Sequence, residues 1–129
     1  MDDIATSFLI ASSNPRKLSE FYAFVCNGKV SNGFSSNHYL IIYREIFKIQ
    51  IYKPSIDKQS FSDAPSKCAL CFQKESAKEP LLKLQEWSNE ILSLGGKVLL
   101  KPRNESFGSE VWMQDPEGNS FLLFVPLLR

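Results

Sequence analysis

Apolar positions along the chain follow a two-residue period in some stretches and a helical period in others. Residues 4–12 form a short apolar run that predicts a buried strand. A helix is expected to begin at Asn14 and Pro15, because asparagine accepts hydrogen bonds at a helix start and proline fixes φ there. Its apolar positions recur three and four residues apart, at Leu18, Phe21, Tyr22 and Val25. Alternation then predicts strands over 38–44 and 46–53.

The same order of elements returns in the second half of the chain. Residues 55–66 are rich in serine, proline and aspartate and are typical of a linker. A strand is predicted over 67–73 and a helix over 76–94, with Gly95-Gly96 ending the helix. Further strands are expected over residues 97–101, 110–114 and 120–125. The pattern therefore predicts one domain built from two modules, residues 4–54 and 67–126.

Two corners join the last strands of these modules. The first is expected at Arg44-Glu45, and the second is the sequence D-P-E-G-N, which begins at Asp115. Aspartate can accept hydrogen bonds from the backbone that follows it, proline presets φ, and Gly118 permits a positive φ. This chemistry predicts a tight turn that leads into the apolar last strand.

Composition narrows the classes of function. The 129 residues include 15 basic and 14 acidic side chains, so the charge balance gives no reason to expect a nucleic-acid partner. No apolar run approaches the about 20 residues that span a bilayer, so no membrane partner is expected. An odd, small number of cysteines favours the reducing cytoplasm. Cys68 and Cys71 are interpreted as core residues, and the only histidine, His38, as a solvent-exposed one.

The chain resembles the vicinal oxygen chelate superfamily in three features. These are the two βαβββ modules, the Phe21-Tyr22 pair in the first helix and the sequence D-P-E-G-N before the last strand. This superfamily is the glyoxalase, bleomycin-resistance and extradiol-dioxygenase group. The resemblance implies an α+β fold in which both modules form one open, curved, eight-stranded mixed sheet with the helices outside. It also implies a concave face that holds the site.

Metal-dependent members of that superfamily place four histidine or glutamate ligands in the concave face. The resemblance assigns these positions to Ser7, Gln50, Cys68 and Leu122, with Lys67 in place of Cys68 if the register shifts by one. Leucine cannot bind a metal ion, and neutral serine or glutamine gives little. We therefore expect neither a metal site nor a cofactor. The metal-dependent activities of the group need a metal ion to polarise a substrate oxygen, so we do not expect them here.

Strand alternation supplies a candidate lining for a pocket. If residues such as Ile49, Ile51 and Leu123 pack under the helices, their neighbours face the other way. The candidate ligand-binding residues are Ser7, Leu9, Lys48, Gln50, Tyr52, Cys68, Leu70, Leu122 and Phe124, with Trp112 at the flank. This mostly apolar set suits a small, largely apolar or aromatic molecule. The same side chains could instead fill a closed core.

Three functions stay open. The leading hypothesis is metal-free binding of such a molecule, as in the bleomycin-resistance type. The second hypothesis is an enzyme. It would be a lyase or isomerase that works by acid–base chemistry with Lys48, Tyr52 or Cys68, or a dioxygenase-type member of the group. A dimeric interaction module without catalysis is the third, because edge strands near 28–33 and 97–101 could pair in a homodimer.

Overall fold

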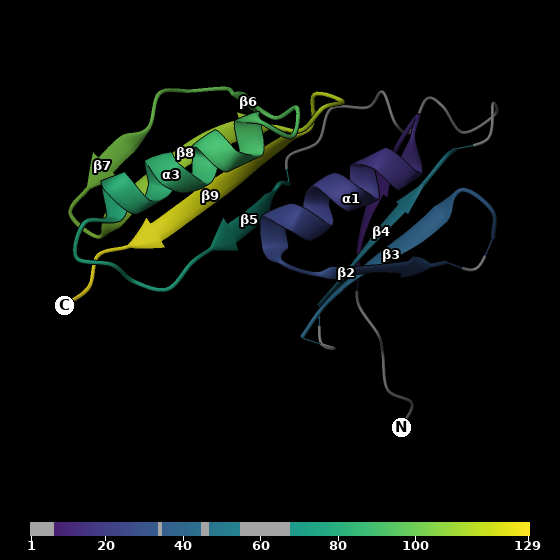
Figure 1. Cartoon of the computed structure of the whole chain (residues 1–129), viewed down its shortest axis with the longest axis horizontal. Coiled ribbons are helices and arrows are strands. Elements are labelled where there is room, and N and C mark those ends of the chain that lie inside the picture. The colour runs from purple at the N-terminus through teal and green to yellow at the C-terminus, as the bar shows by residue number, and fades with distance from the viewer. Residues whose placement is uncertain (1–6, 34, 45–46, 55–67) are drawn as a thin grey trace. The chain divides into compact units, whose positions relative to one another are not determined.

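The computed structural model describes residues 7–33, 35–44, 47–54 and 68–129 (Figure 1). The chain divides into two compact units, residues 1–65 and 66–129, and each is described by itself. Parts of the predicted strands and the predicted linker lie outside the described residues: 4–6, 46 and 55–67. No helix in the described ranges is long and apolar enough to cross a membrane.

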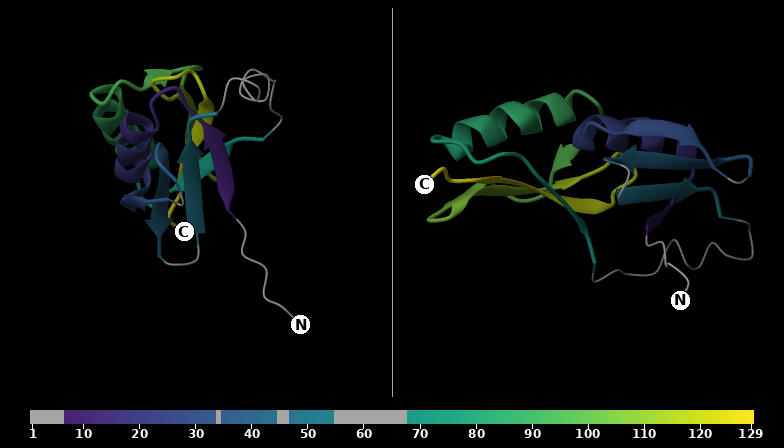
Figure 2. Two further views of the ribbon diagram at one scale, coloured as in Figure 1. Left: turned by 90° about the vertical axis from the view of Figure 1, so that its right-hand side faces the viewer. Right: turned by 90° about the horizontal axis from the view of Figure 1, so that it is seen from below.

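Unit 1 is a four-stranded sheet with one helix on it. Its elements are β1 (Phe8–Ala11), α1 (Pro15–Cys26), β2 (Lys29–Asn32), β3 (His38–Tyr43) and β4 (Phe47–Tyr52). The strand order is β1-β4-β3-β2, with β1 parallel to β4 and the other pairs antiparallel. Figure 2 shows that α1 lies over one face of this sheet.

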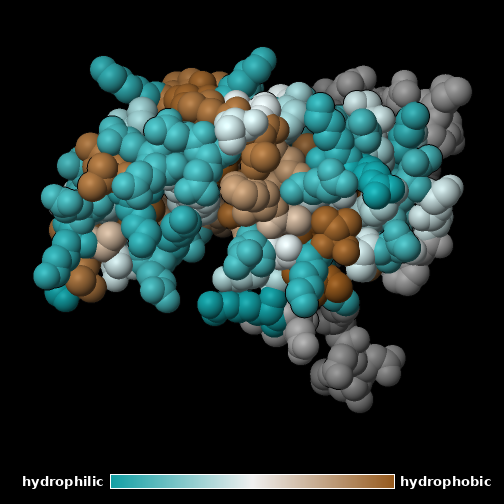
Figure 3. Space-filling view, in the orientation of Figure 1, coloured by the Kyte–Doolittle hydropathy of each residue, from teal (hydrophilic) through white to brown (hydrophobic). Residues whose placement is uncertain are grey.

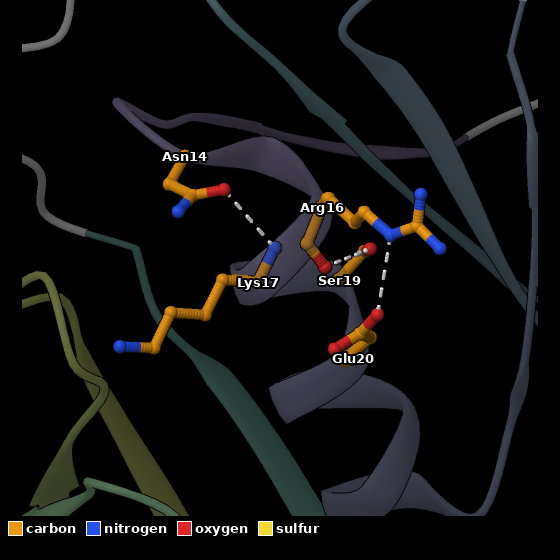
Figure 4. Close-up of polar contacts among 5 residues, drawn as sticks. All are labelled: Asn14, Arg16, Lys17, Ser19 and Glu20. Carbon is orange, nitrogen blue, oxygen red and sulfur yellow. Dashed lines mark hydrogen bonds and ion pairs between the residues drawn. The ribbon is translucent and has the colours of Figure 1, made fainter.

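Helix α1 begins where the sequence predicts (Figure 4). The Oδ1 atom of Asn14 accepts a hydrogen bond from the backbone nitrogen of Lys17 at 3.3 Å, which satisfies a donor that the helix itself cannot. Ser19 donates from its Oγ to the Arg16 carbonyl at 2.7 Å. An exposed ion pair between Arg16 and Glu20, 3.5 Å long, lies on the outer surface. Such a surface pair contributes little to stability.

The core of unit 1 lies between α1 and the sheet. The predicted apolar face of the helix is buried there: Leu18, Phe21, Tyr22 and Val25. The sheet contributes Ile41, Ile49 and Ile51, each at most 1% exposed. The helix ends at Cys26, and its C-terminal cap, Asn27, adopts the left-handed conformation with φ 55°.

Unit 2 is a five-stranded sheet with one helix on it. Its elements are β5 (Leu70–Gln73), α3 (Pro80–Leu92), β6 (Lys97–Val98), β7 (Arg103–Glu105), β8 (Gly108–Gln114) and β9 (Ser120–Pro126). The order is β5-β9-β8-β6, and β7 also pairs with β8. Helix α3 covers one face of the sheet (Figure 2). The outer surface of the helices is mostly hydrophilic with scattered hydrophobic patches (Figure 3).

Several boundaries in unit 2 differ from the prediction. Helix α3 begins at Pro80 and not at residue 76, because proline suits the first helical position and Ala77 instead bridges to Leu127. Strand β6 ends at Val98, since the next two backbone nitrogens both donate to the carbonyl of Trp112. The segment 101–109, expected to be a loop, contains β7.

The turn between β8 and β9 has the predicted chemistry. Asp115 is 2% exposed, and its Oδ1 accepts from the backbone nitrogens of Glu117 and Asn119 at 2.8 and 3.0 Å. Its Oδ2 accepts from the Asn119 side chain at 2.7 Å. Gly118 has φ 88°, which an L side chain rarely adopts. The turn thus fixes the register of the two strands that form the centre of unit 2.

Candidate functional site

The sheet of unit 1 has an open face, opposite α1, and the register defines it. Ile49 and Ile51 point into the core, so their neighbours on β4 point to the open face. The open face carries Ser7, Leu9, His38, Leu40, Ile42, Lys48, Gln50 and Tyr52. All five residues of unit 1 that strand alternation assigns to a lining are therefore on this face: Ser7, Leu9, Lys48, Gln50 and Tyr52.

A chain of two hydrogen bonds crosses this face. The His38 Nε2 atom lies 3.0 Å from Gln50 Oε1, and Gln50 Nε2 donates to Ser7 Oγ at 2.6 Å. An amide oxygen only accepts, so the ring nitrogen that faces it has to carry the hydrogen. Ser7 accepts from Gln50 and keeps its own hydrogen for donation. We call Ser7, Gln50 and His38 the polar chain.

The position of His38 corrects the prediction of a solvent-exposed histidine. The ring is half-buried and belongs to the polar chain. The register of β3 against β4 places His38 opposite Tyr52, on the same face as Gln50. The separation of twelve residues between His38 and Gln50 in the sequence gave no indication of this contact.

The charged side chains of the four strands in unit 1 have one sign. These strands contain Lys29 and Lys48 and no acidic residue. Lys48 lies on the open face, two residues before Gln50. Lys29 pairs with Ile42, which pairs with Lys48, so both lysines share that face. Any charged ligand of the face would meet a positive field.

The open face of unit 2, away from α3, is defined in the same way. One row across the sheet consists of Cys71, Leu122 and Trp112. The next row consists of Gln73, Phe124 and Glu110. The Phe107 ring extends the second row, with its centroid 5.8 Å from that of Phe124. The candidates Leu122, Phe124 and Trp112 are thus half-buried residues of an apolar and aromatic surface.

The expected register of β5 is wrong. Leu70 was expected to face a pocket, but it is 7% exposed and pairs with Phe121 on the face that α3 covers. Phe72 lies on that face too, edge-on to Phe121 at 5.9 Å between ring centroids. Cys71 takes the open-face position instead. A slip of one residue moves every side chain of a strand to the other face.

The cysteines of unit 2 are not core residues. Cys68 lies before β5, and both it and Cys71 are exposed, which corrects the interpretation of both as buried. Partial burial of the sulfur raises the pKa of Cys71, and the nearby Glu110 carboxylate raises that pKa further. At neutral pH this side chain is therefore a thiol and a weak nucleophile.

The sheet register also revises one of the four positions that the resemblance assigns to metal ligands. Leu9 pairs with Gln50, and Cys71 pairs with Leu122. If Gln50 and Leu122 are equivalent, Leu9 is equivalent to Cys71, and the counterpart of Ser7 is Ala69, not Cys68. Hydroxyl, amide, methyl and isobutyl groups do not form a transition-metal site. In the described parts of both units, no three His, Cys, Asp or Glu side chains gather to hold a metal ion.

Unit 2 also contains a groove of about 560 Å³ beside the start of α3. It is lined by residues of the helix, of the segment around β7 and of the C-terminal segment, including Leu82, Gln85, Asn104, Ser106 and Leu127. None of the candidate ligand-binding residues lines it. This groove could not be predicted from the sequence, because part of its lining comes from β7, a strand that the sequence pattern does not predict.

Sequence comparison identifies no relative: no known family model matches the chain, and no curated protein matches it. Solved structures do match. A glyoxalase/bleomycin resistance protein/dioxygenase family enzyme from Burkholderia phytofirmans is 15% identical, with a TM-score of 0.71 over 95% of this chain and 97% of its own. The fosfomycin resistance protein FosX from Listeria monocytogenes, in complex with Mn(II) and sulfate, is 18% identical, with a TM-score of 0.68 over 99% and 94%.

A third structure is that of TnmS3, an antibiotic binding protein from a Streptomyces species. It is 14% identical to this chain, with a TM-score of 0.65 over 97% of each chain. At these identities the likeness shows the fold. The protein therefore has the α+β fold of the glyoxalase and bleomycin-resistance type, and the predicted resemblance to the vicinal oxygen chelate superfamily is confirmed at that level.

Proposed function

We propose that the protein binds a small, largely apolar or aromatic molecule and does so without a metal ion. The polar chain carries this proposal. Two of its members, Ser7 and Gln50, stand where the resemblance places metal ligands. They are hydrogen-bonded to each other, and Gln50 is also hydrogen-bonded to His38. A matching fold occurs in a protein described as antibiotic binding, which is consistent with binding as a function for this architecture.

The donor set argues for a metal-free site. A transition metal needs imidazole, carboxylate or thiolate ligands, and His38 is the one such side chain in the polar chain. In the tautomer that donates to Gln50 Oε1, the Nε2 atom of His38 has no lone pair for a metal. The proposed function therefore includes no step through a metal ion.

The same residues favour binding over acid–base catalysis. A glutamine between histidine and serine is a poor proton relay, because its amide neither ionises nor takes up a proton near neutral pH. The polar chain orients groups, whereas a catalytic triad transfers a proton through its central histidine. On the open face of unit 2, the raised pKa of Cys71 keeps its thiol protonated, which makes it a poor nucleophile.

The test measures metal content and ligand binding in one preparation. Elemental analysis of the purified protein and calorimetry with nickel, zinc, iron and manganese should show no stoichiometric tight binding. Fluorescence titration with a panel of aromatic molecules should give the same affinities before and after treatment with EDTA. Tight binding of one ion per chain, or ligand binding that EDTA abolishes, would overturn the proposal.

A positive control makes a negative metal result informative. The double variant Ser7→His with Gln50→Glu would bring two ligand-type side chains beside His38 and should gain metal affinity. Catalysis is tested separately with Lys48→Met and Cys68→Ser. If the protein is an enzyme that uses these side chains, both variants should abolish turnover. Under the proposal, the variants fold and still bind the aromatic ligands.

We also propose that the protein is a homodimer of the cytoplasm. Strand β2 forms an edge of the unit 1 sheet, and all four of its residues are exposed, including Val30. Such an edge can pair with a second strand. All three cysteines are free thiols, which suits a reducing compartment. Sedimentation analysis should give a dimer that Val30→Lys weakens, and a monomer at high concentration would contradict this.

A further inference from the structure

We infer that the bound molecule carries a carboxylate, and that Ser7 binds this carboxylate beside Lys48 on the open face of unit 1. The inference rests on the proposed function and adds the class of ligand. It follows from the direction of the hydrogen bonds in the polar chain and from the charges around it. Neither depends on how the two units are arranged.

Ser7 is left as a hydrogen-bond donor. Its oxygen already accepts from Gln50 Nε2 at 2.6 Å, and the side chain is exposed. A hydroxyl that accepts one bond can still donate its hydrogen to a second group. An oxygen acceptor on the ligand therefore satisfies Ser7, and a donor on the ligand competes with Gln50.

His38 and Gln50 act as positioning residues for that donor. The Gln50 amide could rotate by half a turn, and then its oxygen would face Ser7 and take up the hydroxyl hydrogen. The His38 ring opposes this rotation in the tautomer that carries the hydrogen on Nε2, because that donor needs the Gln50 oxygen, 3.0 Å away, as its acceptor. In that tautomer, His38 determines the direction of both hydrogen bonds in the polar chain, and Ser7 remains a donor for the ligand.

The surroundings select a negative and apolar ligand. Lys48 and Lys29 share the open face with Ser7, and the four strands of unit 1 carry no acidic side chain to neutralise them. Leu9 and Leu40 flank Gln50 on the neighbouring strands. Leu9 is 48% exposed, so it offers apolar surface to a ligand. A carboxylate on an aromatic or aliphatic body matches both features.

The experiment compares three probes with one ring system. Naphthoate, naphthalenemethanol and naphthylmethylammonium are titrated into the wild-type chain by calorimetry in the presence of EDTA. We expect naphthoate to bind at least about tenfold more tightly than the alcohol, because hydrogen bonds to charged groups are stronger than neutral ones. The ammonium probe, which offers donors to a positive surface, should bind most weakly.

Variants then test each step. Ser7→Ala should lower naphthoate affinity about tenfold and change the alcohol by less than about threefold. Ser35→Ala, an exposed serine outside the site, is the matched control and should change neither. His38→Phe should reduce the preference for naphthoate, whereas His38→Gln, which keeps a donor toward Gln50, should restore most of it. Gln50→Glu should reverse the preference toward the ammonium probe.

The outcomes separate the inference from the proposed function. Equal binding of all three probes in EDTA would overturn the inference and leave metal-free binding intact. Failure of naphthoate to bind while the alcohol binds would do the same. Failure of a broad aromatic panel, with or without metal ions, would overturn both. If His38→Gln behaves like His38→Phe while both variants unfold as the wild type does, the positioning role is wrong.

Discussion

The carboxylate of Asp115 should make a large contribution to the stability of unit 2. It is 2% exposed and accepts three hydrogen bonds, from two backbone nitrogens and the Asn119 amide, at 2.7 to 3.0 Å. Each hydrogen bond to a charged group contributes about 1.5–3 kcal/mol. Their sum is reduced by the cost of burying the carboxylate, so Asp115→Ala should lower the free energy of unfolding by about 3 kcal/mol.

Urea unfolding followed by tryptophan fluorescence measures this loss. With a slope of about 1–3 kcal/mol per molar urea, a loss of about 3 kcal/mol lowers the midpoint by about 1–3 M. Asp115→Asn keeps an oxygen acceptor but not the charge, so its loss should be about half as large. Glu117→Ala, on the exposed tip of the same turn, should change stability by less than about 0.5 kcal/mol. If Asp115→Ala unfolds at the same midpoint as Glu117→Ala, the turn does not hold the strands in register.

Two further predictions test the faces of the unit 2 sheet. Leu123 is fully buried and Leu122 is half-buried on the open face, so Leu123→Ala should cost about 2–5 kcal/mol and Leu122→Ala less than about 1 kcal/mol in the same assay. Glu110→Gln removes one cause of the raised Cys71 pKa, so at pH 7 more thiolate forms and alkylation by iodoacetamide should speed up modestly. Fragment mass spectrometry distinguishes Cys71 from Cys68, and an unchanged rate at Cys71 would contradict the assignment.

Local chemistry was the part of the fold that the sequence predicted well. The start of α1 depends on Asn14 and Pro15, and the β8–β9 turn depends on Asp115 and Gly118. In each case the groups that interact are within a few residues of one another. A hydrogen bond of this kind can be recognised from residue type and spacing alone.

Strand faces were harder to predict, because they depend on where pairing begins. Residues 67–73 were expected to form one strand, but the strand begins at Leu70, and its partner Phe121 decides which face is buried. Alternation in a short apolar segment such as A-L-C-F is compatible with either face. Leu70 and Cys71 consequently exchanged roles between prediction and structure.

The polar chain shows what a prediction from single positions leaves out. Ser7 and Gln50 were singled out for their places in the strands and judged as metal ligands, one residue at a time. Their partner, His38, comes from another strand, and only the β3–β4 register brings its ring to Gln50. A hydrogen-bond direction is a property of all three residues, so no residue on its own could indicate the polarity of the site.

The absence of ligating side chains also sets a lower limit on the size of the ligand. One hydrogen bond from Ser7 to a carboxylate supplies about 1.5–3 kcal/mol, whereas a Kd of 1 μM corresponds to about 8 kcal/mol. The remaining energy, about 5–6.5 kcal/mol, would require about 200–260 Å² of buried apolar area at about 25 cal/mol per Å². An aromatic side chain buries about 150–250 Å². A micromolar ligand of this face must therefore be at least about as large as an aromatic side chain, and a small carboxylate such as acetate should bind far more weakly than naphthoate.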